Sequence, residues 1–97
     1  MSLSSRLVER KLRQSASRLR ALRDELRVID EQLPSLQADA DDGDMRALFD
    51  ETGGSNAEAR RARGSAEAMV RQRARVVESI ATWERRQDEL LDRLARR

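Results

Sequence analysis

Cysteine and histidine are both missing from this chain of 97 residues. A chain without cysteine cannot form a disulfide bond, a thiolate nucleophile or a cysteine-based zinc site. A chain without histidine also lacks the commonest general base and metal ligand of proteins. We therefore expect no enzyme: no catalytic residue, no cofactor and no bound metal. The acidic residues between Asp39 and Glu51 do not have the spacing of an EF-hand loop, and we interpret them as a solvated turn.

Aromatic residues make up only 2% of the chain and proline occurs once, whereas charged residues reach 39%. This composition is typical of long helices and coiled coils rather than of a globule with a thick core. No stretch is apolar over the length that a membrane span needs, so we expect no membrane insertion. The N-terminus also lacks the apolar core of a signal peptide, which favours a cytoplasmic location.

Aliphatic residues recur along both halves of the chain, with spacings that alternate between three and four. The repeat is interrupted at Ser15 in the first half and at Arg73 and Gln87 in the second. Such a repeat places a narrow apolar stripe on one side of a helix, where it packs against a partner helix. The expected helix–helix interface consists of Val8, Leu12, Leu19, Leu22, Leu26, Ile29, Leu33 and Leu36, and of Met69, Val76, Ile80, Trp83, Leu90 and Leu94.

The two stripes predict an all-α fold, an antiparallel coiled-coil helical hairpin. We expect the first helix over residues 4–40, with a kink near Pro34, because proline removes a helical hydrogen bond and clashes with the preceding turn. An end of this helix at Leu33 is the alternative. Residues 41–55 are rich in glycine and are expected to form the connection, and the second helix is expected over residues 56–96.

Two further features bear on the details of the hairpin. Ser55 and Glu58 have the spacing of a capping box, which marks the start of the second helix. For the two stripes we favour the alignment that pairs Leu26 with Val76. A shift by one heptad is the alternative, but it sets polar residues of the second stripe against aliphatic residues of the first.

Charge is segregated along the chain although the net charge is only +2. Residues 1–23 are basic, residues 24–58 are acidic and residues 59–97 are basic. In an antiparallel hairpin the acidic end of the first helix faces the basic start of the second, so we expect ion pairs between the helices. A nucleic-acid partner stays open, but it is not favoured. The arginine clusters that it would use are Arg60, Arg61, Arg63, Arg71, Arg73 and Arg75, and the group Arg6, Arg10, Lys11 and Arg13. The favoured basic patch is the hairpin base, with Arg6, Arg10, Arg93, Arg96 and Arg97.

A few aliphatic residues lie beside the narrow stripes and widen them beyond what one neighbouring helix covers. Hairpins of two helices usually need a further partner to be stable. We therefore expect a homodimer of hairpins that forms a four-helix bundle, with an unknown protein partner as the alternative. The candidates for the oligomer interface are Leu7, Val28, Val70, Val77 and Leu91.

A short helical turn in the connection would place apolar side chains next to acids at the tip of the hairpin. The candidate tip contacts are Asp44, Met45, Leu48 and Phe49. Exposed apolar residues of this kind can dock into another protein. Alternatively they fold back and close the open end of the bundle, which is the interpretation we favour.

In outline, an acid-tipped antiparallel hairpin is similar to the coiled-coil domains of bacterial factors that enter the secondary channel of RNA polymerase. The similarity rests on Gly43-Asp44 and on Asn56-Ala57-Glu58. These five residues are separated by an insertion, so we use the similarity as an analogy and assign no family.

The sequence thus predicts a single helical-hairpin domain over residues 1–97. We interpret it as a non-enzymatic coiled-coil module for interaction, scaffolding or regulation, which acts through protein–protein contacts and self-association. The alternatives are a nucleic-acid-associated protein that uses the arginine clusters and a transcription-type factor that acts through its acidic tip.

Overall fold

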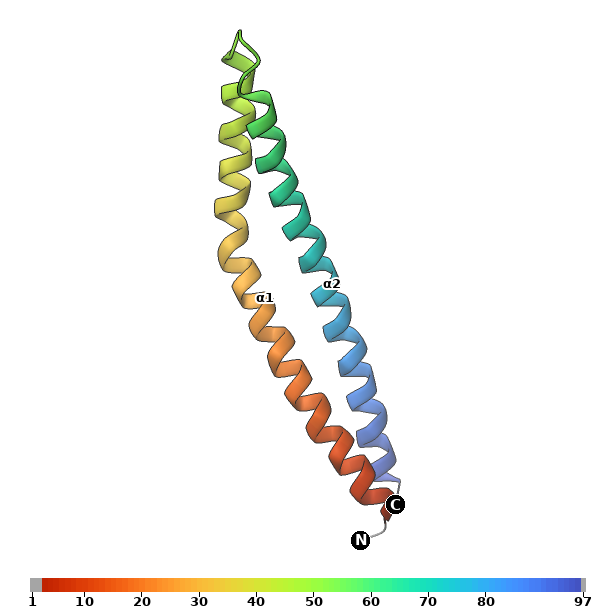
Figure 1. The fold of residues 1–97 in the computed structure, drawn as a ribbon. Coiled ribbons are helices and arrows are strands. Elements are labelled where there is room, and N and C mark those ends of the chain that lie inside the picture. The colour runs from red at the N-terminus through yellow and green to blue at the C-terminus, as the bar shows by residue number, and fades with distance from the viewer. Residues whose placement is uncertain (1–2, 97) are drawn as a thin grey trace. The chain divides into compact units, whose positions relative to one another are not determined.

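Two long helices make up the fold in the computed structural model, which describes residues 3–96 (Figure 1). Helix α1 spans Leu3–Phe49 and helix α2 spans Asn56–Ala95. The helices pack against each other as a hairpin, and no strand is present among the described residues. The all-α hairpin expected from the aliphatic repeat is therefore confirmed.

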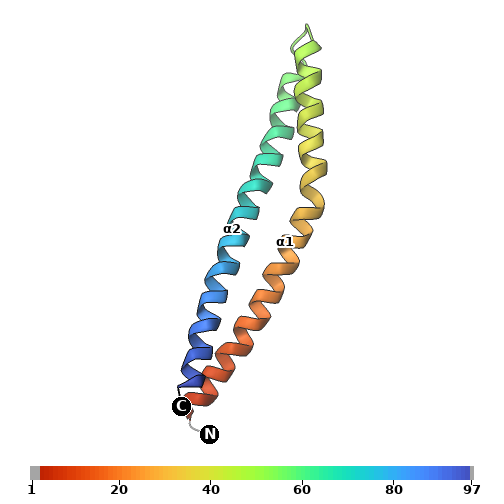
Figure 2. The ribbon, with the colours of Figure 1, turned by 180° about the vertical axis from the view of Figure 1, so that it is seen from behind.

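The contacts divide the hairpin into two compact units. Unit 1 contains the described residues up to Leu26 and from Arg75 onward, and unit 2 runs from Arg27 to Ala74. In unit 1 the first turns of α1 lie beside the last turns of α2, and in unit 2 the connection joins neighbouring helix ends, as both Figure 1 and Figure 2 show. That the whole chain forms one domain stays a prediction.

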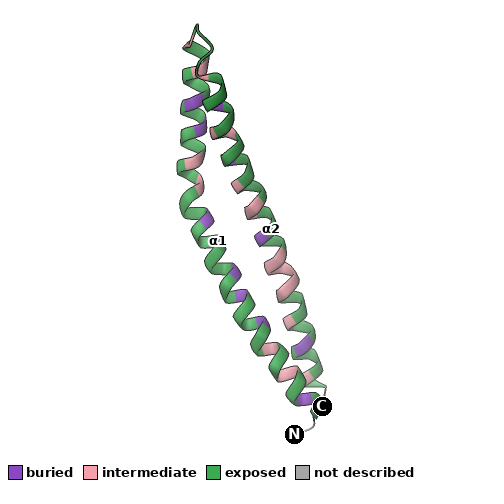
Figure 3. Cartoon of the chain, viewed as in Figure 1, coloured by how far each residue is buried: buried purple, intermediate pink, exposed green. Residues whose placement is uncertain are grey.

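The core of each unit lies on the sides of α1 and α2 that face each other (Figure 3). In unit 1 it contains branched aliphatic residues, among them Leu19, which is only 1% exposed, and Leu22. In unit 2 smaller residues dominate, with Ala40, Ala59 and Ala66 all buried. The apolar stripes thus change from bulky residues in unit 1 to small residues in unit 2.

Small residues allow α1 and α2 to approach closely near the connection. A Cβ atom placed on the buried Gly43 would lie 3.4 Å from the Cα atom of Ala59, which is a backbone contact across the helix pair. The favoured alignment, in which Leu26 pairs with Val76, also sets Gly43 opposite Ala59 when it is continued along both helices. The shifted alignment would instead set Ala59 against Leu36, so the close contact supports the first.

The predicted end of the first helix at residue 40 is wrong, because α1 continues to Phe49. The connection is therefore residues 50–55 rather than 41–55. Glycine and three nearby aspartates suggested a loop, but Gly43 serves helix packing here. Arg63 also binds Asp41 and Asp44, whose negative charge would otherwise oppose the dipole at the end of α1.

The alternative end at Leu33 is wrong as well, since Pro34 lies inside α1 without ending it. The kink predicted at this position stays a prediction. Helix α2 begins at Asn56, as expected, and ends at Ala95, one residue before the expected end.

Candidate interaction surfaces

The connection between the helices is organised by Asp50, which the sequence interpretation treated only as one of several tip acids. Its carboxylate accepts hydrogen bonds from the Thr52 hydroxyl at 2.6 Å, the Thr52 amide at 3.0 Å and the Ser55 amide at 2.6 Å. Bonds from Thr52 and then from Ser55 lower the pKa of Asp50 below its ordinary value. The spacing of Asp50 and Thr52, typical of an Asx turn, is the sequence signal that could have revealed this role.

Asp50 also takes the place of Glu58 in the expected capping of α2. The Ser55 carbonyl accepts a hydrogen bond from the Ala59 amide at 3.0 Å, so Ser55 occupies the N-cap position. Its amide donates a hydrogen bond to the Asp50 carboxylate. The capping box had predicted Glu58 as the acceptor. Gly53 completes the reversal with a φ of 74°, a backbone conformation that favours glycine.

The apolar residues near the connection remain at the surface. Met45 is 57% exposed, Leu48 79% and Phe49 78%. Within the described hairpin these side chains do not fold back over the helix ends. The favoured interpretation, in which they close the open end of a bundle, involves a second hairpin and stays a prediction. Asp44, the fourth candidate for the tip, lies within α1 and is bound by Arg63.

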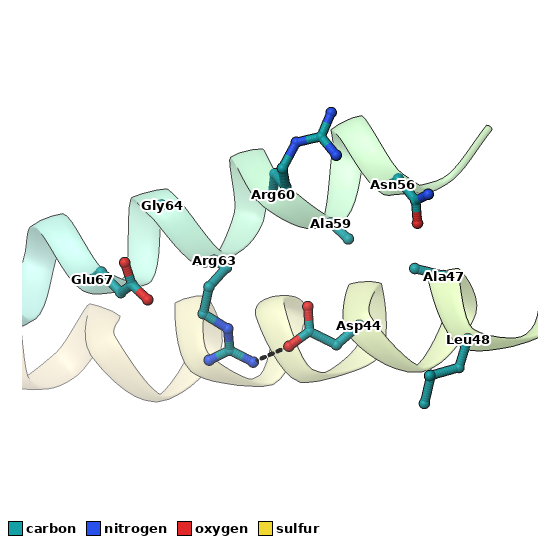
Figure 4. Close-up of a pocket in the computed structure, with 9 residues that line it drawn as sticks. All are labelled: Asp44, Ala47, Leu48, Asn56, Ala59, Arg60, Arg63, Gly64 and Glu67. Atoms are coloured by element: carbon teal, nitrogen blue, oxygen red, sulfur yellow. Dashed lines mark hydrogen bonds and ion pairs between the residues drawn. The ribbon is translucent and has the colours of Figure 1, made fainter. Parts of the chain in front are cut away.

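An open groove of about 660 Å³ lies between the two helices of unit 2, next to these residues (Figure 4). Arg63 reaches across it from α2, with distances of 2.8 Å to Asp41 and 2.5 Å to Asp44. Both hydrogen bonds raise the pKa of Arg63, and the one to Asp41 has the larger effect. In Figure 4 the Arg60 side chain points away from α1, and the Leu48 side chain points away from α2. The groove is lined by Asp44, Ala47, Leu48, Asn56, Ala59, Arg60, Arg63, Gly64 and Glu67.

Ion pairs between the helices occur in both units, as the segregated charges predicted. In unit 2 the Arg73 Nε atom lies 2.7 Å from Asp30, whose hydrogen bond raises the pKa of Arg73. In unit 1 Arg23 lies 3.3 Å from Glu84. All of these side chains are well exposed, so water and salt screen the pairs and each contributes little to stability. The ion pairs fit the favoured alignment of the helices, and they are not the main source of stability.

The ion pairs also identify the two edges of each unit. Arg23 and Glu84 directly follow the stripe residues Leu22 and Trp83. Asp44 and Arg63 directly follow Gly43 and Ala62, which continue the two stripes at the same spacing and face each other. Successive helical residues are rotated by about 100°, so a residue that precedes a stripe residue lies on the opposite edge from one that follows it. We call the edge that carries these pairs the ion-pair edge.

The predicted interface residues differ in burial according to their role. Every residue expected in the helix–helix interface is buried or half-buried, whereas all five oligomer candidates are exposed. Val77 and Leu91 in unit 1, and Val70 in unit 2, directly follow stripe residues and lie on the ion-pair edge. Leu7 in unit 1 and Val28 in unit 2 precede stripe residues and lie on the opposite edge. The five candidates therefore do not share one face.

Neither a membrane-spanning helix nor a metal-binding cluster is found within residues 3–96. No described helix is long and apolar enough to cross a membrane. No three carboxylates, cysteines or histidines of the described chain come together in a group that could hold a metal ion. Comparison with known proteins gave no match to a family model, to a curated protein or to a solved structure.

Proposed function

We propose that this chain is a non-enzymatic interaction module that acts through protein–protein contacts, the first of them with a second copy of itself. The observation that supports the proposal is the exposure of aliphatic side chains directly beside the buried stripes. On the ion-pair edge of unit 1, Val77 is 42% exposed and Leu91 is 50% exposed. Aliphatic residues that flank a helix–helix core are typically covered by a further helix.

The small size of the core supports the same conclusion. The buried hydrophobic residues of the described chain include three alanines, and the large members are few. A pair of helices buries only one side of each helix, so much apolar surface stays in contact with water. A second hairpin against the ion-pair edge would enlarge the core of unit 1 with Val77 and Leu91, as in a four-helix bundle.

The proposal is tested by measuring the mass of the protein in solution over a range of concentrations. We expect a dimer at micromolar concentration for the wild type and a monomer for the double variant Val77→Ser/Leu91→Ser. Leu7→Ser is the matched control, because it removes an equally exposed aliphatic residue from the opposite edge of unit 1. A monomeric wild type would contradict self-association, and an equal loss of dimer in the control would contradict the choice of edge.

The acidic tip supports a transcription-type factor less well. Asp41 and Asp44 are bound by Arg63, and the Asp50 carboxylate is occupied by the connection itself. The exposed residues that remain for a partner at the tip are mainly apolar, with Leu48 and Phe49 the largest. We therefore treat the tip as a second surface for protein contacts and not as an acidic probe.

A further inference from the structure

Unit 1 carries five cations on the edge opposite its ion-pair edge, together with the carboxylates of Glu25 and Glu89. One of the five, Arg75, has an interaction within the chain, which leaves four. Lys11 and Arg18 of α1 each directly precede a stripe residue, as do Arg86 and Arg93 of α2. Of these four, the sequence interpretation placed only Arg93 in a patch shared by both helices, so it did not combine them. We call this set the basic edge of unit 1.

Cations face cations across the basic edge, where a coiled coil normally places opposite charges. Lys11, Arg86 and Arg93 line one groove of about 310 Å³ together with a single carboxylate, that of Glu89. Lys11 and Arg93 also line a second groove of about 330 Å³ toward the helix ends, and no acid lines that groove. The like charges therefore lie close together on opposite helices, which destabilises the hairpin when no counter-charge is present.

None of the four cations forms an ion pair with another residue of the described chain. Their side chains are exposed to solvent. This distinguishes them from Arg63 and Arg73 in unit 2, which are bound by aspartates of α1. The basic edge thus meets the main requirement for phosphate binding, a row of unpaired cations on one side of the molecule.

An aromatic side chain lies at the same edge. The guanidinium carbon of Arg86 lies 4.9 Å from the ring centroid of Trp83, and both residues line a further groove of unit 1. Proteins that bind nucleic-acid strands combine a basic groove with aromatic or guanidinium planes on which bases stack. Trp83 and Arg86 offer such a plane beside the cations.

From this arrangement we infer that the basic edge of unit 1 binds the phosphodiester backbone of a nucleic acid. A second copy of the chain fits this edge less well. Its acids at Asp30, Asp41 and Asp44 are already bound by arginines of their own unit, and the Asp50 carboxylate is occupied by the connection. The acids that form no ion pair within the described chain, such as Asp24, Asp39 and Asp42, have no regular spacing along the helix. A nucleic-acid backbone supplies regularly spaced anions that need no prior ion pair to be broken. This binding is separate from the proposed self-association, which uses the opposite edge.

The repeat of the cations fits an extended ligand. Lys11 and Arg18 are seven residues apart, and so are Arg86 and Arg93. At 1.5 Å per residue each pair extends over about 10 Å of helix, in two rows on neighbouring helices. Guanidinium groups bind phosphate oxygens with two parallel hydrogen bonds, so three of the four positions favour phosphate contacts.

The inference is tested with the full chain by fluorescence anisotropy of labelled oligothymidylate and of a random DNA duplex. The test variant is Lys11→Gln/Arg18→Gln. The matched control is Arg13→Gln/Arg20→Gln, which removes the same charge with the same spacing from the same helix but on the ion-pair edge. Glutamine is a good helix former, so both variants should keep the fold, which circular dichroism verifies.

For single-stranded DNA the logarithm of the association constant falls with that of the salt concentration at about −0.7 per phosphate contact. Four contacts give a slope of about −2.8, and the test variant should show about −1.4. At ~0.1 M monovalent salt the same difference corresponds to a roughly 25-fold weaker affinity for the test variant. The control should bind like the wild type.

Three results would overturn the inference. The first is a wild type that binds neither oligonucleotide at low salt. The second is a control that loses as much affinity as the test variant, because the cations of unit 1 would then act without regard to position. The third is wild-type binding to poly-glutamate or to vesicles with anionic lipids that is tighter than binding to an oligonucleotide of equal charge, since the ligand would then be another class of polyanion.

Discussion

From the contact between Gly43 and Ala59 we predict how substitutions of glycine change the free energy of unfolding. Two glycines lie inside helices, Gly43 in α1 and Gly64 in α2. A Cβ atom on Gly43 would lie 3.4 Å from the Cα and 3.8 Å from the Cβ of Ala59, whereas a Cβ atom on Gly64 would meet nothing within 4 Å. The two positions therefore share their backbone conformation and differ in the space around them.

Alanine and valine separate the effect of helix propensity from the effect of space. Gly→Ala in a helix interior gains about 1 kcal/mol, and Gly→Val gains about 0.4 kcal/mol. At Gly64 we expect these gains with no further cost. At Gly43 the alanine Cβ fits as an ordinary contact, but the γ-carbons of valine would press on Ala59, and overpacking of this kind costs about 1–3 kcal/mol. Gly43→Val should thus be destabilising and Gly64→Val should not.

The measurement is urea unfolding followed by circular dichroism, with all variants at one protein concentration because self-association changes the apparent stability. The quantity of interest is the difference between the two valine variants in the free energy of unfolding. Equal stability of Gly43→Val and Gly64→Val would refute the close approach of α1 and α2 at Ala59. Loss of stability in Gly43→Ala would show an even tighter contact than the structure has.

Three further predictions concern the connection, the core and the surface charges. Asp50→Asn should lower the melting temperature at neutral pH, and Glu51→Gln is the control. The pKa of Asp50 is lower in the folded state than in the unfolded chain. The difference in melting temperature from wild type should therefore be complete above about pH 4 and should shrink as the pH falls further. A difference that grows in acid would contradict this role. Leu19→Ala should cost about 2–5 kcal/mol of stability, whereas Leu48→Ala should change it by less than about 0.5 kcal/mol, and equal losses in urea unfolding would contradict the assigned burial. Arg23→Gln should cost less than about 1 kcal/mol, and the loss should vanish at high salt if the exposed pair with Glu84 acts as described.

The helices and their pairing could be predicted because the aliphatic repeat carries that information directly. Leu19, Leu22 and Val76 are buried where the repeat places them. The end of α1 could not be read in the same way, since glycine and aspartate are local signals for a loop. Asp44 is bound by Arg63 and Gly43 packs against Ala59, both of them residues of the other helix. These signals become visible only once the helices are paired.

The candidate surfaces were predicted only in part, for a similar reason. The aliphatic candidates Val77 and Leu91 are exposed as expected, but which edge they occupy depends on the position of ion pairs such as Arg23 with Glu84. The basic edge follows from the sequence once each cation is placed relative to the stripe. A count of charges along the chain does not reveal the basic edge, because neighbouring cations such as Lys11 and Arg13 lie on opposite edges.

The hydrogen bonds of Asp50 have a consequence for the order of folding. A chain reversal that is held by its own backbone and one carboxylate can form before the helices are complete. The pairing of Arg63 with Asp44 then closes a loop of 19 residues, whereas the pairing of Arg23 with Glu84 spans 61 residues. Short loops close at a lower cost in chain entropy, so the hairpin should nucleate in unit 2 and zip toward unit 1, where each closed turn shortens the next loop.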